Sequence, residues 1–304
     1  MFFEDIHCKW GDKVKKGVNT FSNIFLAPAL LIYSVLTIIP VALTTWYSFT
    51  DWNGIGKQTF NMFMNYKDLV SDSNYWTSVK NTIILMVLAL IIQIPFGLLF
   101  AYIVSRIKAG YKFFRSVYFL PVVVASAATA TMFVLFFNSD IGPFNKMLDF
   151  IGLGAIKQNW LSDPNLVIYF VALPQVWQYI GIHFIIYLAA IQSIPEDIIE
   201  SALIDGATGF RIFTRIVIPM LWGVIQVTVI LCITGCLKAF DFSWIMTWGG
   251  PGYSSTYIAV DMFRTVFKEA GFGYGSSMAV SILIYSLILT VMFRKFVARE
   301  GKDQ

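Results

Sequence analysis

The chain has 304 residues, of which 57% are hydrophobic and 17% aromatic, while only 13% are charged. A soluble domain carries about 25% charged residues, so this composition excludes an ordinary water-facing surface and places the chain in a membrane. The net charge of +4 is too small to indicate a nucleic-acid partner, and three cysteines do not make a disulfide framework.

Six apolar runs are long enough to cross a bilayer, for which about 20 residues are needed. None contains Asp or Glu, and they cover residues 21–48, 81–104, 116–138, 166–192, 219–238 and 273–293. The first run is longer than the apolar part of a signal peptide, about 7–15 residues, so we expect an uncleaved span. The sequence predicts an all-α polytopic membrane protein, divided into a tail at 1–20, a six-span domain at 21–293 and a second tail at 294–304.

The distribution of Lys and Arg predicts the orientation of the chain. With the N-terminus in the cytosol, the inside segments hold 14 of these residues and the outside segments hold 8. We therefore expect both termini on the cytosolic side. Four spans contain a proline, which tends to kink a helix and would suit a pathway that changes shape, namely Pro40, Pro95, Pro121 and Pro174. Small residues at 125–130 predict a close helix–helix contact, either ordinary packing within the bundle or an interface.

The most informative segment is polar and lies at 193–219, between the fourth and fifth spans. Ser193 followed by Glu196 fits a capping box that would begin a short helix with an apolar stripe of Ile198, Ile199, Ala202 and Leu203. Gly206 permits a sharp turn, and Thr208 is positioned to cap a second short helix, whose apolar side would hold Phe210, Phe213, Ile216 and Val217. We predict two short helices joined at a glycine corner and shaped to be gripped by a cytosolic partner.

This segment resembles the EAA loop of the permease subunits of bacterial ABC importers. The matching residues are Glu200-Ser201-Ala202, Asp205-Gly206-Ala207, Phe213, Ile216 and Pro219, with Ser201 replacing the usual alanine. The surrounding chain resembles the carbohydrate branch of that family, of the maltose and glycerol-phosphate type. That likeness rests on the run from Phe114 to Pro121, on Phe240-Asp241 and on Gly249-Gly250-Pro251-Gly252.

The resemblance implies a type I ABC importer permease fold in the bacterial cytoplasmic membrane. It implies a coupling helix docked in a dimeric cytosolic ATPase, with the residues Glu200, Ser201, Ala202, Asp205, Gly206, Ala207, Phe210, Arg211 and Pro219 at that contact. It also implies a heterodimer with a second permease, and an extracytoplasmic solute-binding protein that faces Trp248, Gly249, Gly250 and Pro251.

The chain lacks a phosphate-cradling loop: Gly54-Ile55-Gly56-Lys57 has Asp51 where the first glycine of that motif would stand. Proton or sodium coupling usually leaves ionisable groups within the spans. His183 is the one titratable residue at mid-depth, and a lone histidine there is more often a packing residue. We therefore expect no enzymatic activity and no cofactor or metal in this chain, with ATP and Mg²⁺ bound by the partner ATPase.

A solute pathway needs polar and aromatic groups at depth, because sugars present both hydroxyls and apolar C–H faces. The candidates are Gln175, Trp177, Gln178, Tyr179, Tyr187, Thr234, Gly235 and Cys236. For Trp177 and Tyr179, membership of an interfacial aromatic belt is the competing interpretation. The same architecture could import another solute, such as a glycerol phosphate derivative or a peptide. A membrane transferase is the remote alternative, because the acidic residues of the 193–219 segment point to different sides of their helix.

Overall fold

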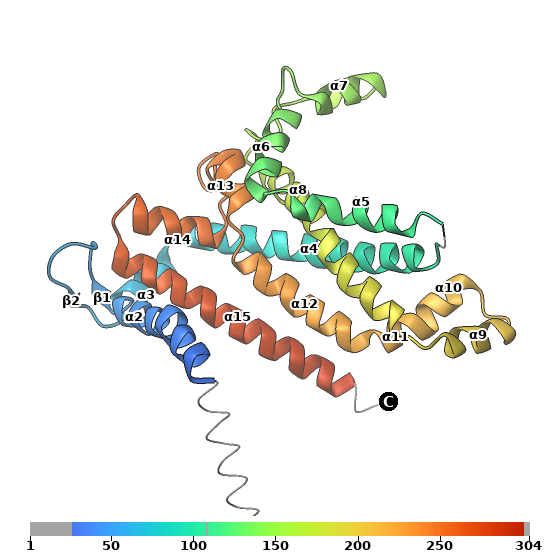
Figure 1. Cartoon of the computed structure of the whole chain (residues 1–304). Helices are drawn as coiled ribbons and strands as arrows, with labels where there is room; N and C mark the ends of the chain where they lie inside the picture. The colour runs from blue at the N-terminus through green and yellow to red at the C-terminus, as the bar shows by residue number, and fades with distance from the viewer. Residues whose placement is uncertain (1–25, 108, 301–304) are drawn as a thin grey trace, which may run out of the picture.

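The computed structural model describes residues 26–107 and 109–300, with side chains to residue 295. The chain is helical nearly throughout, as its apolar runs predict (Figure 1). The first span covers Leu26–Tyr47 and includes the π-helical turn η1 (Ser34–Ile38) and α2 (Ile39–Tyr47). The other long helices are α4 (Ser73–Ser105), α8 (Val167–Gln192), α12 (Trp222–Leu237) and α15 (Phe272–Glu300).

Within the described ranges, five helical segments are long and apolar enough to cross a membrane, and a sixth crossing exists if one bent pair counts as a single span. That pair is α5 (Tyr111–Val123) and α6 (Ser126–Phe136), which meet at 89°. The third predicted run, at 116–138, therefore contains a sharp break after Pro121, the proline expected to kink it. α6 packs against α13 with Thr129 and Ala130 buried, whereas Ala127 and Ala128 are exposed.

The bend depends on a side chain from another span. A break in a membrane helix leaves backbone carbonyls without their helical partners, which is costly away from water. Gln178 on α8 donates from Nε2 to the carbonyls of Pro121 and Val124, at 3.1 and 2.7 Å, and is itself 1% exposed. Pro95 and Pro174, in contrast, lie inside helices that remain continuous. Proline alone thus does not decide where a span breaks.

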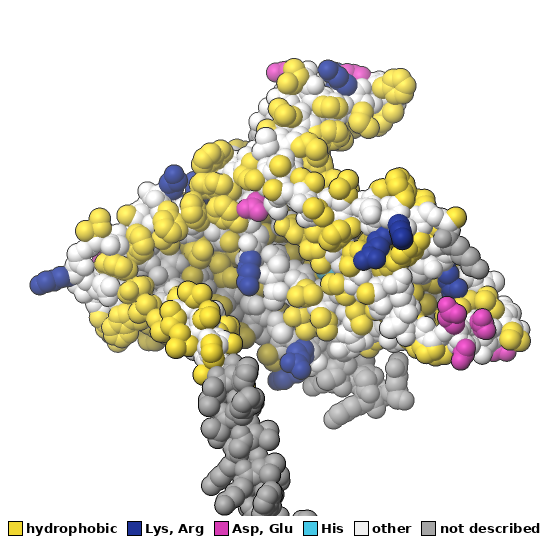
Figure 2. Space-filling model, in the orientation of Figure 1, with side chains coloured by type: hydrophobic (Ala, Val, Ile, Leu, Met, Phe, Trp, Pro, Cys, Tyr) yellow, Lys and Arg dark blue, Asp and Glu magenta, His cyan; other side chains and the backbone are white. Residues whose placement is uncertain are grey.

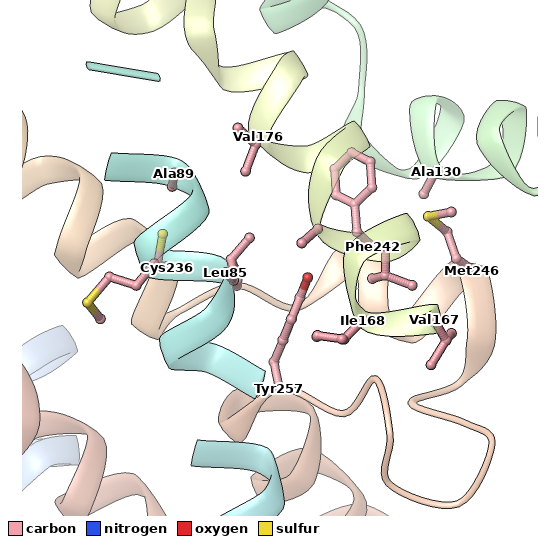
Figure 3. Close-up of a cluster of buried hydrophobic side chains, with 14 of the residues drawn as sticks. Leu85, Ala89, Ala130, Val167, Ile168, Val176, Cys236, Phe242, Met246 and Tyr257 are labelled. Atoms are coloured by element: carbon pink, nitrogen blue, oxygen red, sulfur yellow. The ribbon is translucent and has the colours of Figure 1, made fainter. Parts of the chain in front are cut away.

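The core lies where α4, α8 and α12 meet the short helix α13 (Asp241–Thr247), and α4 and α8 form the most extensive helix pair. Figure 3 shows the side chains that converge there, among them Leu85, Ala89, Val167, Ile168, Val176, Cys236, Phe242, Met246 and Tyr257. A second apolar cluster joins the C-terminal halves of α4 and α8 to the 193–219 segment. Both clusters tie the long spans to the polar segments that follow them.

The connections are grouped at opposite ends of the bundle (Figure 1). One end holds α9 (Glu196–Ile204), α10 (Gly209–Ile212), η3 (Phe213–Val217) and α11 (Ile218–Met220). The other holds the antiparallel hairpin of β1 (Thr50–Asp51) and β2 (Thr59–Phe60), with Thr50 opposite Phe60, and the helices α3 (Met64–Ser71) and α14 (Ile258–Phe267). Beyond α6, α7 (Pro143–Phe150) projects from the bundle and is followed by the 3₁₀ turn η2 (Gly154–Ile156).

Candidate functional site

The 193–219 segment folds as two short helices around a glycine corner, as the sequence predicts. Gly206 has φ +75°, a backbone conformation that favours glycine. Its N–H donates to the Leu203 carbonyl at 3.1 Å, and the Ala207 N–H donates to the Ala202 carbonyl at 2.9 Å. These two bonds form a Schellman motif, which satisfies the last carbonyls of α9 and fixes the direction of the chain into α10.

The predicted capping box is wrong. α8 continues to Gln192, so Ser193 is the C-cap of that helix, and its hydroxyl donates to the Ala190 carbonyl at 2.7 Å. α9 begins after Pro195, which makes no side-chain cap. Thr208 does occupy the N-cap position of α10, but its side chain also makes no capping hydrogen bond. The acidic first turn of α9, Glu196 and Asp197, still complements the positive end of the helix dipole.

Most residues of the predicted coupling set are exposed, namely Glu200, Ser201, Asp205, Gly206, Phe210, Arg211 and Pro219. Ala202 is buried and Ala207 is half-buried, and both pack into the second apolar cluster. Phe210 was expected on the apolar side of its helix, but it is 76% exposed. The segment therefore presents a mixed apolar and charged surface beyond the bundle, where Figure 2 shows a group of acidic side chains near the α9–α10 end.

The segment is held firmly to the spans. The Tyr102 hydroxyl of α4 donates to the Gly209 carbonyl at 2.6 Å, and the Tyr102 ring packs on Phe213 with centroids 4.8 Å apart. Ile212 and Val217 are each 1% exposed in the second apolar cluster. A force applied to α9 and α10 therefore passes directly to α4 and to the start of α12.

A cavity of about 390 Å³ lies between α4, α8, α12 and the start of α13. Its polar and aromatic lining consists of Gln93, Gln175, Tyr179, His183, Cys232, Cys236, Lys238, Phe240, Asp241 and Phe242. Oε1 of Gln175 and Nδ1 of His183 are buried and have no hydrogen-bond partner among the described residues. Buried acceptors without partners are rare and destabilising, so these two atoms fit a site that receives donor groups.

Gln93 on α4 joins three spans beside this cavity. Its Nε2 donates to the Val176 carbonyl at 3.2 Å, which leaves Oε1 as the acceptor. The Nε2 of His183 lies 3.1 Å from that oxygen, and the Cys232 thiol donates to it at 3.5 Å. Because that oxygen can only accept, His183 donates from Nε2, and its Nδ1 has no partner among the described residues. Sequence reasoning missed Gln93, although an amide in the middle of an apolar run was a usable signal.

The structure brings together some of the predicted pathway residues and separates others. Gln175, Tyr179, Gly235 and Cys236 line the cavity, whereas Trp177, Gln178, Tyr187 and Thr234 do not. Trp177 is 45% exposed on another side of α8 and packs edge-on against Phe133. The Tyr187 hydroxyl bonds Thr228, and the Thr234 hydroxyl donates to Ile230 on its own helix. These three side chains thus have local packing partners outside the cavity.

The predicted docking loop at Trp248–Pro251 lies at the end opposite α9. Trp248 is 63% exposed, Gly249 is buried, and Gly250 and Pro251 are half-buried. Gly249 has φ +80°, and an added Cβ would clash with the Thr256 hydroxyl, so no other residue fits there without rearrangement. Hydroxyls of Ser255 and Thr256 donate to the Gly250 and Gly249 carbonyls, which holds Trp248 outward on a rigid base.

Asp261 on α14 is a buried carboxyl close to this loop. It is 3% exposed, and its Oδ2 has no hydrogen-bond partner among the described residues. Burial raises the pKa of Asp261 from 3.8 to about 6, with Asp72 and Glu269 adding to the rise, while Ser78 and Arg264 oppose it. The folded chain therefore binds this proton more tightly than the unfolded chain does.

We expect the pKa of Asp261 to make the folded state less stable as pH rises from about 4 to about 6, by about 3 kcal/mol in total. The charged form is the one that burial disfavours, so stability is highest when the carboxyl is protonated. Asp261→Asn removes the titration and should flatten this part of the pH profile. Thermal unfolding of both proteins in detergent, between pH 4 and pH 8, measures the difference. Parallel profiles would show that the carboxyl is hydrated in the folded state.

An apolar helical bundle, with a polar cavity among its spans and an exposed, rigidly held segment at one end, is the architecture of a polytopic membrane transport subunit. The chain belongs to the family of binding-protein-dependent transport system inner membrane components, whose profile matches residues 93–300. It is thus a transport subunit rather than an enzyme. Transport by systems of this family depends on a binding protein.

Several relatives match nearly the whole chain. A probable ABC transporter permease protein of Pyrococcus horikoshii is 34% identical over 89% of this chain and 93% of its own. The trehalose/maltose transport system permease protein of Thermococcus litoralis is 29% identical over 96% and 98%. The alpha-glucoside transport system permease protein of Rhizobium meliloti is 31% identical over 88% and 79%.

Solved structures share the fold. A chain from a bacterial ABC transporter involved in the import of the acidic polysaccharide alginate superposes with a TM-score of 0.81 at 23% identity, covering 95% of this chain and 98% of its own. The type I importer permease fold implied by the sequence resemblance is therefore confirmed.

Proposed function

We propose that this chain is the permease subunit of an ATP-driven importer for an oligosaccharide or a related neutral sugar. The observation that carries the proposal is the nearly full-length similarity to permeases of trehalose/maltose and alpha-glucoside transport systems. A starch degradation products permease of Thermoanaerobacterium thermosulfurigenes, 29% identical over 88% of this chain, supports the same solute class.

The lining of the cavity has the chemistry that a sugar requires. The unpaired acceptors on Gln175 and His183 match hydroxyl donors, and the rings of Tyr179 and Phe240 match apolar C–H faces. A sugar that donates to the two buried acceptors would remove the penalty of leaving them unpaired. The cavity, at about 390 Å³, suits a small saccharide unit rather than a folded ligand.

The charges on the lining argue against an anionic solute such as a glycerol phosphate. Lys238 is the cation of the described lining, and Asp241 lies three residues further along the chain on the same cavity. A phosphate-binding site normally presents a clear excess of donors and positive charge. One lysine opposed by one aspartate gives no such excess, so the balance favours a neutral solute.

The transport cycle needs partners, because the chain offers no nucleotide loop of its own. We infer that α9 and α10 dock into a dimeric cytosolic ATPase that binds ATP and Mg²⁺, and that the chain pairs with a second permease as a heterodimer. Both termini lie in the cytosol, and the loop around Trp248 faces the solute-binding protein outside the bacterial cytoplasmic membrane. ATPase closure then moves the 193–219 segment, which is bonded to α4, and switches access to the cavity.

The test is the ATPase activity of the assembled complex. The chain is co-expressed with its second permease, its ATPase and its solute-binding protein, and the purified complex is placed in nanodiscs. We expect the binding protein loaded with maltose, trehalose or another glucoside to stimulate hydrolysis about tenfold over the unloaded protein. Stimulation by glycerol phosphodiesters or peptides alone would overturn the carbohydrate assignment but leave the permease assignment intact.

A further inference from the structure

The segment at 48–72 forms a small rigid unit between α2 and α4, at the end opposite α9, and is called here the hairpin wing. Its centre is Asn65 of α3, which is 7% exposed and donates from Nδ2 to the carbonyls of Ser48 and Thr50, each at 2.9 Å. The Ser48 hydroxyl also lies 2.7 Å from the Tyr66 hydroxyl. These bonds lock α3 and the β-hairpin onto the end of the first span.

The hairpin wing presents four large apolar side chains that are more than half exposed. Phe60 is 62% exposed, Met62 63%, Phe63 65% and Met64 52%. Met62 also has φ +57°, which is uncommon for a residue with a side chain and marks a backbone held against its preference. Asn65 holds this part of the chain in place, so these four exposed side chains have fixed positions and do not belong to a loose loop.

The exposed apolar surface of the hairpin wing continues directly from that of the first span. Trp46, in the last turn of α2, stacks on Phe60 with ring centroids 6.0 Å apart, and Phe49 meets Phe63 edge-on at 5.3 Å. α2 itself has no buried residues, and its apolar side chains face outward along its length. Figure 2 shows hydrophobic side chains covering this helix and the region beside it.

The depth of the hairpin wing matches the boundary between acyl chains and head groups. Trp46 marks the end of the first span, and Trp76, 47% exposed in the first turn of α4, marks the start of the second. Trp76 donates from Nε1 to the Val70 carbonyl at 2.8 Å. Tryptophan is enriched at this level of a bilayer, because its ring is apolar and its N–H is polar. Lys57 and Lys67 are exposed on the same unit together with Asp51 and Asp68, so the unit offers both signs of charge to polar head groups.

We propose that the hairpin wing is a lipid anchor that inserts Phe60, Met62, Phe63 and Met64 into the bilayer leaflet at the end of the protein opposite α9. The occupant of the patch is phospholipid, because the patch is continuous with a membrane-spanning helix and flanked by interfacial tryptophans. The hairpin wing also contacts α15: the Gly273 N–H donates to the Trp52 carbonyl at 3.0 Å, and an added Cβ on Gly273 would meet the Thr50 carbonyl. A lipid-held hairpin wing therefore fixes the depth of both the first and the last span.

The test is photocrosslinking in the intact complex, reconstituted in nanodiscs of phosphatidylethanolamine and phosphatidylglycerol. Benzoylphenylalanine replaces Phe63 in one protein and Phe210 in another; Phe210 is 76% exposed in this chain and serves as the control because we place it against the ATPase rather than against lipid. A third protein carries the probe at Met62, so that a folding defect at one position does not decide the outcome. Mass spectrometry then identifies the adduct on each labelled peptide.

We expect lipid adducts at positions 62 and 63 to exceed those at position 210 about tenfold, as for a side chain at the acyl boundary. Crosslinks mainly to the second permease or to the binding protein would overturn the proposal and assign the patch to a protein partner. A lipid yield equal to that at position 210 would also overturn it. The measurement needs no transport, so its result is independent of whether the solute is a carbohydrate.

Discussion

Gly206→Pro is expected to abolish uptake while leaving the chain in the membrane. Proline fixes φ near −65°, whereas Gly206 has φ +75°, and proline also removes the N–H that donates to Leu203. The conflict costs about 3 kcal/mol or more, so about a hundredfold fewer molecules keep the corner that aims α9 and α10. Sugar uptake by cells and the amount of ATPase that co-purifies with the chain measure the effect.

The chain contains a matched control for this substitution. Gly152 ends α7 with φ +78°, and its N–H donates to the Asp149 carbonyl while the Leu153 N–H donates to the Leu148 carbonyl, which is the same Schellman motif. Gly152→Pro therefore causes the same local damage on the projecting arm, far from α9. The ATPase should co-purify normally with this variant. If it were lost from both variants equally, general misfolding rather than coupling would explain the Gly206 result.

Gly235→Trp should block the solute cavity. Gly235 lines that cavity, and a Cβ added there meets no other atom within 4 Å, so an indole can extend into the open space without displacing the helix. Excluding solute volume should lower uptake about tenfold or more, which corresponds to only about 1.4 kcal/mol. The ATPase should remain bound, because α9 and α10 are unchanged. Uptake and co-purification are measured on the same preparations.

Gly223 provides the comparison for that experiment. It lies on α12 like Gly235, is exposed, and also has nothing within 4 Å of an added Cβ, but it does not line the cavity. Gly223→Trp therefore adds the same side chain to the same helix without filling the site. Normal uptake with Gly223→Trp and reduced uptake with Gly235→Trp would identify the cavity as the solute route. Normal uptake in both variants would contradict that role.

Sequence reasoning located the spans because hydrophobicity is a local property, but it could not locate the break at the third span. Pro121 precedes that break, yet Pro95 and Pro174 lie in continuous helices. The difference is Gln178, which supplies hydrogen bonds from another span. A contact between residues so far apart in sequence leaves no periodic signal in either segment.

The glycine corner was predictable because its geometry depends on one residue type, whereas the start of α9 was not. Ser193 and Glu196 fit a capping motif, but α8 extends to Gln192. Ser193 is therefore the C-cap of α8, and its hydroxyl donates to the Ala190 carbonyl instead. The cavity shows a similar limit: Gln175 and Tyr179 were found as neighbours of a proline, while Trp177 between them faces another side of α8. In a helix that is apolar all round, the side that each residue faces can be assigned only when the neighbouring helices are known.

The amide of Gln93 has a mechanical consequence. It is hydrogen-bonded at once to the backbone of α8, the imidazole of His183 and the thiol of Cys232, so it links the three helices α4, α8 and α12. Sliding of these helices past one another would have to break all three hydrogen bonds together. The amide of Gln93 therefore resists separation of α4, α8 and α12 at its own level, and we expect helix movement during transport to be larger toward their ends.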